Sequence, residues 1–140
     1  MPDAAPEPWA PSPSLDTTVS RPRPGAVLLA VAGEVDTRTA PDLAAGLDTA
    51  LDAVGDEPGI GVVVDLGAVT FLASSGLAVL IGGANRATEL GRRLHLVAGT
   101  RAVARPLQVT GADALFETHD DVDSALAVAA AEGVAPPPGE

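Results

Sequence analysis

Two adjacent serines followed by a glycine are the residues of this sequence best placed to do chemistry. Ser74, Ser75 and Gly76 lie where an expected loop passes into an expected helix. A helix N-terminus carries free N–H groups and a partial positive charge, so it accommodates a hydroxyl or a phosphate. One serine could cap the helix while the other hydroxyl faces solvent, and Gly76 keeps the position open because it has no side chain. The segment therefore predicts a hydroxyl that either caps a helix or is available for modification.

A pair of carboxylates forms the second candidate cluster. Glu34 and Asp36 follow an expected strand and precede an expected helix. Paired carboxylates could perform acid–base chemistry or bind Mg²⁺. The context favours a polar loop whose carboxylates accept backbone N–H groups, and such a loop could also contact a protein partner. Asp65, at the end of another expected strand, is interpreted as a loop cap rather than a catalytic group.

Other catalytic and metal-binding arrangements are scarce. The segment around Ser74 lacks the first glycine of the G-x-S-x-G nucleophile motif. Of the 2 histidines, His95 falls in an expected strand and His119 in an expected solvent-facing turn. The chain has no cysteine, which excludes a thiolate nucleophile, and no lysine, which excludes a P-loop. We therefore expect no metal, no cofactor and no enzyme activity.

Composition excludes several classes of partner. The 140 residues include 19 acidic and 8 basic side chains, giving a formal net charge of −11, and only 2% are aromatic. An acidic surface repels nucleic-acid phosphates and anionic membranes, and a base-stacking platform needs more aromatic faces. No segment has the roughly 20 apolar residues that cross a bilayer, and the N-terminus lacks the pattern of a secretory signal. We therefore expect a cytoplasmic protein that binds neither nucleic acid nor membrane.

Proline marks both ends of the expected domain. Five of the 13 prolines lie in residues 1–13, and three more lie at 136–138. Proline-rich ends of this kind are typical of disordered tails. We therefore divide the chain into a tail at 1–13, one domain at 14–132 and a second tail at 133–140.

Within the domain, strand-like and helix-like hydrophobic patterns alternate. Apolar and β-branched runs predict five strands, at 14–20, 26–32, 60–66, 94–98 and 115–118. Apolar spacings of three and four predict four helices, starting near residues 40, 77, 102 and 122, the first with Leu43, Leu47, Leu51 and Val54 on one face. Residues 67–72 are expected to form a loop. The order β-β-α-β-α-β-α-β-α predicts an α/β fold with a largely parallel sheet, made mixed by the first hairpin.

Three segments taken together resemble the STAS domain family. They are Gly33-Glu34-Val35-Asp36, then Val62-Val63-Val64-Asp65-Leu66, then the run VTFLASSGLAVL at 69–80. The later Val109-Thr110-Gly111, followed by Leu115-Phe116, extends the resemblance over residues 14–132, and it is strongest to the anti-sigma factor antagonist branch. The resemblance implies a STAS-like mixed β-sheet with helices mainly on one face, in agreement with the element order above.

The resemblance also implies a function. Members of this branch are bacterial proteins that bind an anti-sigma factor, usually also a serine kinase, and thereby release the sigma factor. The kinase phosphorylates the first serine of the motif, here Ser74 with Ser75 as the alternative, and a PP2C-type phosphatase removes the phosphate. ATP and Mg²⁺ belong to the kinase, so this chain needs neither.

Partner contacts are expected where the two motif segments meet. Both follow strands of the sheet at their carboxyl ends, so we expect them at one edge. The expected contact residues are Glu34, Asp36, Thr37, Arg38, Ala73, Ser74, Ser75 and Gly76. Ala73 departs from the family pattern, in which this position is commonly Asp. Ser75 could be used instead, or the protein could be a constitutive antagonist.

Two other functions remain open on the sequence. The chain could be a STAS scaffold, or a soluble accessory module of a stress-sensing or lipid-transport assembly. From a different class, an enzyme using Glu34, Asp36 and Ser74 would hydrolyse substrate without any partner.

Overall fold

The elements of the chain occur in the order expected from its hydrophobic pattern. The computed structural model describes residues 15–55 and 60–133, so both predicted tails, 1–13 and 133–140, lie outside it except for Gly133. The elements in the described residues are β1 (Asp16–Arg23), β2 (Ala26–Val35), α1 (Ala40–Val54), β3 (Gly61–Leu72), α2 (Ser74–Glu89), β4 (Leu94–Val97), α3 (Arg101–Thr110), the 3-10 turn η1 (Ala112–Leu115), β5 (Glu117–His119) and α4 (Val122–Gly133).

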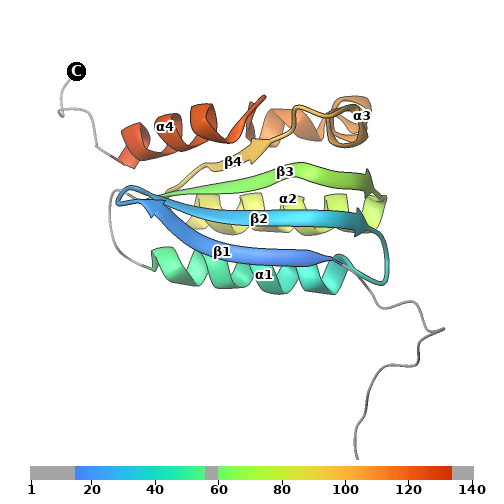
Figure 1. The fold of residues 1–140 in the computed structure, drawn as a ribbon, viewed down its shortest axis with the longest axis horizontal. Coiled ribbons are helices and arrows are strands. Elements are labelled where there is room, and N and C mark those ends of the chain that lie inside the picture. Colours follow the sequence, from blue (N-terminus) through green and yellow to red (C-terminus); the bar gives the residue numbers. More distant parts are fainter. Residues whose placement is uncertain (1–14, 56–59, 134–140) are drawn as a thin grey trace, which may run out of the picture.

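The strands form one mixed sheet in which spatial order follows chain order. Within the described residues the order is β1-β2-β3-β4-β5. β1 pairs antiparallel with β2, and every later pair is parallel. This arrangement confirms the predicted hairpin followed by helical crossovers (Figure 1).

Helices cover the two faces of the sheet unequally. Along β2, Val27 and Leu29 enter the larger core cluster with α1 and α2, whereas Ala26 and Leu28 face the smaller cluster under α4. This alternation follows from the two-residue period of a strand. The two buried residues of α3, Val103 and Leu107, also join the larger cluster. The expectation of helices mainly on one face is therefore confirmed, with α4 on the other face.

The first helix forms where the sequence pattern predicts it. Its buried face includes Leu43, Leu47, Leu51 and Val54, which recur at spacings of three and four. Pro41 lies in the first turn, where a missing N–H group breaks no helical hydrogen bond. Gly55 follows the last turn with φ of 55°, a conformation that favours glycine.

The predicted loop at 67–72 is wrong, because the strand continues through it. β3 runs to Leu72 and pairs with the end of β2, through Ala32↔Ala68 and Val35↔Leu72. The register shifts between Ala30 and Ala32, and again between Gly33 and Glu34. Such irregularities interrupt the alternation of apolar and polar residues, so the pattern fails to indicate a strand.

The last strand is shorter than predicted, and its histidine is not a solvent-facing turn residue. Residues up to Leu115 form η1, and His119 ends β5 beside Val97. His95 is fully buried, and its Nδ1 lies 3.0 Å from Nε2 of the half-buried His119.

Among the described residues no group of three or more His, Cys, Asp or Glu could hold a metal ion. Across 15–55 and 60–133, no helix is both long and apolar enough to cross a bilayer.

Candidate functional site

The two segments with candidate chemistry meet where β2 and β3 end (Figure 1). Val35 and Leu72 are the last paired residues of these strands. The next backbone N–H, that of Ala73, donates to the carbonyl oxygen of Val35 at 2.8 Å. This hydrogen bond joins the start of α2 to the loop that leaves β2. The expected sharing of one sheet edge is therefore found in the structure.

Gly76 allows the two segments to approach closely. A Cβ atom built on Gly76 would overlap the side chain of Val35 and lie 2.9 Å from Cδ1 of Leu72. Real Cβ atoms essentially never come closer than 3.0 Å to such neighbours. The glycine therefore serves packing beneath the site, rather than opening space above it as its sequence context suggested.

A compact turn holds the loop between β2 and α1. The side chain of Thr39 is buried, and its hydroxyl donates to the carbonyl oxygen of Glu34 at 2.7 Å. The hydroxyl oxygen of Thr39 in turn accepts the N–H of Asp36 at 2.9 Å. The carboxylate of Asp36 accepts the N–H groups of Arg38 at 2.9 Å and Thr39 at 3.1 Å. Asp36 is thus the backbone-binding carboxylate that the sequence favoured.

The electrostatics of Asp36 follow from these bonds. The N–H of Thr39, and secondarily that of Arg38, stabilises the charged carboxylate and lowers the pKa of Asp36 below its usual value. A general base for catalysis near neutral pH would need its pKa moved the other way. The Asp36 carboxylate is therefore suited to holding the turn, while the side chains of Glu34, Thr37 and Arg38 are exposed around it.

Neither serine caps the helix. Ala73 occupies the N-cap position with extended backbone (φ −83°, ψ 168°), so Ser74 and Ser75 begin the first turn. No side chain caps this helix end, and no acidic residue lies in its first turn. The prediction that one serine is the N-cap is therefore wrong by one position. β3 runs to Leu72 and α2 begins at Ser74, so Ala73 is the single residue between them and takes the N-cap position.

The two serines differ sharply in their surroundings. Ser74 is exposed, whereas Oγ of Ser75 is buried and has no hydrogen-bond partner among the described residues. A protein reaching this edge from solvent meets the hydroxyl of Ser74 and not that of Ser75. Chemistry that requires an approaching macromolecule is therefore confined to Ser74 in this conformation.

Sequence reasoning missed two residues that build this edge. Thr39 is absent from the expected contact residues, although its hydroxyl bridges two backbone groups. Phe71 was assigned to a loop, although it is a strand residue whose side chain is 52% exposed. Asp65 accepts the N–H of Gly67 at 2.9 Å, as expected of a cap, but within the irregular part of β3.

A family model and a curated relative both match most of this chain. The family model described as "Mlab, STAS domain" matches residues 20–117. The anti-sigma-F factor antagonist RsfB of Mycobacterium tuberculosis is 33% identical over 105 residues, spanning 73% of this chain and 80% of RsfB.

Solved structures agree with the fold. The crystal structure of an anti-sigma factor antagonist from Mycobacterium paratuberculosis superposes with a TM-score of 0.70 at 31% identity, covering 86% of this chain and 97% of that one. The Bacillus cell fate determinant SpoIIAA in its phosphorylated form superposes with a TM-score of 0.58, covering 78% of this chain and 96% of that one. Its 14% identity restricts that similarity to the fold.

Proposed function

Since the chain belongs to the STAS domain family, we propose that it acts as an anti-sigma factor antagonist, a regulatory binding protein rather than an enzyme. The observation that carries this proposal is the edge where an exposed Ser74 lies beside the hydrogen-bonded turn at 36–39. The 33% identity to an anti-sigma-F factor antagonist supports the same assignment. The partner is an anti-sigma factor with serine kinase activity, and its capture releases a sigma factor in the cytoplasm.

The contact surface combines the two segments. Glu34, Thr37 and Arg38 offer exposed polar and charged side chains on one side of the edge. Ala73 and Ser74 offer the small side chains of the helix start on the other side, and the N–H of Ala73 donates to the carbonyl oxygen of Val35 in the first segment. Because Asp36 and Thr39 fix the turn by hydrogen bonds, little conformational entropy is lost there on binding.

Phosphorylation of Ser74 switches this surface off. A phosphoryl group adds about −1.5 to −2 charges at neutral pH. In the free protein, the partial positive charge at the start of α2 stabilises that phosphate by roughly 0.3–1 kcal/mol, so the fold survives. In the complex, the charge would lie within a contact that excludes water, and its desolvation opposes binding. A loss of only ~1.4 kcal/mol weakens affinity tenfold.

The choice of Ser74 over Ser75 rests on exposure. Kinases bind an accessible hydroxyl, and Oγ of Ser75 is buried. Ala73 stands where the family commonly has Asp, so no carboxylate at that position orients the hydroxyl or contacts the kinase. A PP2C-type phosphatase restores the free hydroxyl, and ATP and Mg²⁺ are bound by the kinase rather than by this chain.

The test uses the purified chain, a serine-kinase anti-sigma factor and radiolabelled ATP. We expect label on the wild type and on Ser75→Ala, but none on Ser74→Ala. Phosphorylation should weaken the complex at least tenfold in a pull-down or by calorimetry, and Ser74→Ala should stay bound. Label on Ser75→Ala and Ser74→Ala alike would remove Ser74 from the proposal.

A second candidate is a STAS scaffold or accessory module of a stress-sensing or lipid-transport assembly. The family model that matches residues 20–117 supports it, because its description, "Mlab, STAS domain", names a STAS domain without naming an anti-sigma factor. Binding to a kinase-type anti-sigma factor distinguishes the two candidate functions. An antagonist binds a kinase-type anti-sigma factor whether or not it is phosphorylated afterwards, whereas a scaffold module binds none of them.

A further inference from the structure

A shallow groove lies between the end of β3 and α3. Phe71 of β3 and Val109 of α3 line it, and these side chains are 52% and 74% exposed. Pro106 contributes further apolar surface, and the groove holds about 520 Å³. Large apolar side chains that are exposed and adjacent to one another are typical of surfaces that bind a protein segment or another ligand.

The groove carries positive charge on a strongly acidic protein. Arg101 and Arg105 line it, four residues apart on α3, and among residues 15–55 and 60–133 no acidic side chain does so. The whole chain has a formal net charge of −11. Two of its 8 basic residues therefore border one apolar groove. Such a groove is complementary to a segment that is apolar, aromatic and acidic.

The chain contains one such segment. Residues 1–14, MPDAAPEPWAPSPS, lie outside the described part of the structure and include Asp3, Glu7 and the only tryptophan, Trp9. The segment has 5 of the chain's 13 prolines and no arginine. Proline-rich segments are preorganised as extended polyproline II, and they dock into grooves lined by aromatic and apolar side chains.

The segment joins the domain at the same edge as the groove. Asp16 at the start of β1 pairs with Ala32, and Ala32 pairs with Ala68 of β3. Phe71 pairs with Glu34, two residues further along β2. Two strand spacings are about 10 Å and two residues along a strand about 7 Å. Trp9 lies seven positions before Asp16, and seven extended residues span up to about 25 Å, so the connection is long enough for Trp9 to reach the groove.

We propose that residues 1–14 bind in this groove of their own chain, with the Trp9 ring against Phe71 and Val109 and over Arg101 or Arg105. The arginines add a cation–π contact to the ring and an electrostatic attraction to Asp3 and Glu7. A short tether gives an effective concentration of about 1 mM, so an intrinsic dissociation constant near 1 mM already fills about half of the grooves.

The fluorescence of the full chain tests the proposal directly, because Trp9 is the only tryptophan. We expect its emission to lie to the blue of a free peptide of residues 1–14, with weaker quenching by acrylamide. Phe71→Ser and the double variant Arg101→Glu/Arg105→Glu should move both quantities to the values of the free peptide. Circular dichroism checks that each variant stays folded, and the half-exposed Phe71 makes that the expected result.

Matched controls lie elsewhere on the surface. Leu115→Ser removes a side chain that is 48% exposed outside the groove, and Arg23→Glu reverses a charge at the opposite end of β1; neither should move the emission. Wild-type emission equal to that of the peptide overturns the proposal, as does an equal shift in Leu115→Ser. An emission shift that disappears on dilution also overturns it, because the segment then binds a second copy.

Discussion

At the residue scale, the candidate site depends on side chains that are small or hidden. Gly76 lets the start of α2 rest on Val35, and Thr39 fixes the turn from within. Neither residue offers chemistry to a partner. Both residues position Ser74 and the exposed residues of the turn. Their substitution should therefore lower the stability of the protein, and should weaken partner binding only as a consequence.

Substituting alanine at Gly76 should be destabilising. The added Cβ overlaps Val35, and inserting a methyl group into a packed site costs about 1–3 kcal/mol. Gly82 of the same helix is the matched control, because a Cβ there meets nothing within 4 Å. Gly82→Ala should stabilise the protein by about 0.5–1 kcal/mol through helix propensity. Chemical denaturation measures both, and two changes of the same sign would contradict the packing role.

Removing the hydroxyl of Thr39 should also lower the free energy of unfolding. Thr39→Val leaves the N–H of Asp36 and the carbonyl of Glu34 without this partner, and the loss of these partly buried hydrogen bonds costs about 0.5–1.5 kcal/mol each. Thr49→Val removes an exposed hydroxyl that only bonds within α1, so its effect should stay within about 0.5 kcal/mol. Urea unfolding of the two variants makes the comparison, and equal losses would refute the special role of Thr39.

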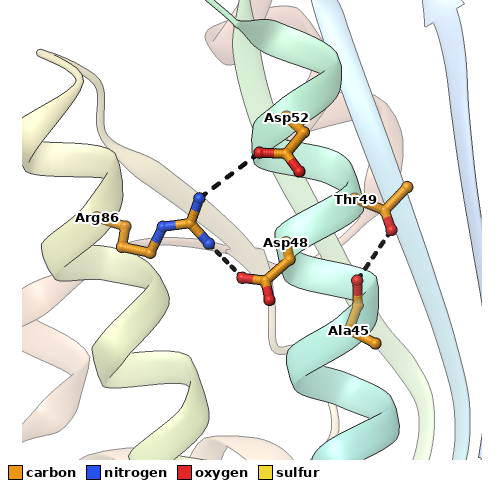
Figure 2. Close-up of polar contacts among 5 residues, drawn as sticks. All are labelled: Ala45, Asp48, Thr49, Asp52 and Arg86. Carbon is orange, nitrogen blue, oxygen red and sulfur yellow. Dashed lines mark hydrogen bonds and ion pairs between the residues drawn. The ribbon is translucent and has the colours of Figure 1, made fainter.

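At the scale of elements, an ion-pair bridge links the two helices beneath the sheet. Figure 2 shows the Arg86 side chain of α2 reaching Asp48 and Asp52 of α1. The two carboxylates are four residues apart on one helix face and repel each other, so the guanidinium also relieves that repulsion. All three side chains are between 43% and 78% exposed, which limits what the bridge contributes.

The coupling between Arg86 and Asp48 should be small and sensitive to salt. A double-mutant cycle with Arg86→Ala and Asp48→Ala should give about 0.2–1 kcal/mol at low ionic strength. In 1 M salt the Debye length falls to about 3 Å, and the coupling should vanish. A coupling above about 2 kcal/mol that persists in salt would mean that the bridge, rather than the apolar core, sets the helix packing.

At the scale of the whole molecule, two acid effects oppose each other. The net charge of −11 makes the folded chain repel itself, and acidification toward the isoelectric point near 4.3 relieves that repulsion. Hydrogen bonds act in the other direction. The N–H of Thr39 lowers the pKa of Asp36, and that of Ser124 lowers the pKa of Asp121 at the start of α4.

Stability should therefore rise from pH 7 to about pH 5 and fall below about pH 4. A carboxyl whose pKa is lower when folded binds fewer protons in the native state, so its stabilisation holds above the unfolded pKa of about 3.9 and is lost as pH falls through the folded value. Thermal unfolding at 0.1 and 1 M salt separates the effects. High salt should reduce the gain in stability between pH 7 and about pH 5 but leave the loss of stability below about pH 4. If high salt also abolishes the loss below about pH 4, that loss comes from the overall charge and not from the two hydrogen-bonded carboxyl groups.

Sequence reasoning succeeds where the chain follows regular periods. The face of α1 with Leu43, Leu47 and Leu51 has a single helical period, and it is buried as predicted. It fails where tertiary pairing overrides the pattern. Residues 67–72 are held as a strand by β2 across irregular register, and His119 is turned toward His95 by β4. The burial of the Ser75 Oγ and the close packing of Gly76 on Val35 are tertiary features that no local signal in the sequence encodes.

The correspondence between spatial and chain order of the strands has a consequence for biosynthesis. A nascent chain leaves the ribosome N-terminus first, so β1 and β2 can close as a local hairpin before the remaining strands exist. Each later strand then joins the open side of a sheet that already stands, and none has to be inserted between two paired neighbours. The three residues of β5 are the last strand to be made and pair at the edge formed by β4. α4 follows and packs against the sheet. Assembly in this protein can therefore keep pace with translation, one strand at a time.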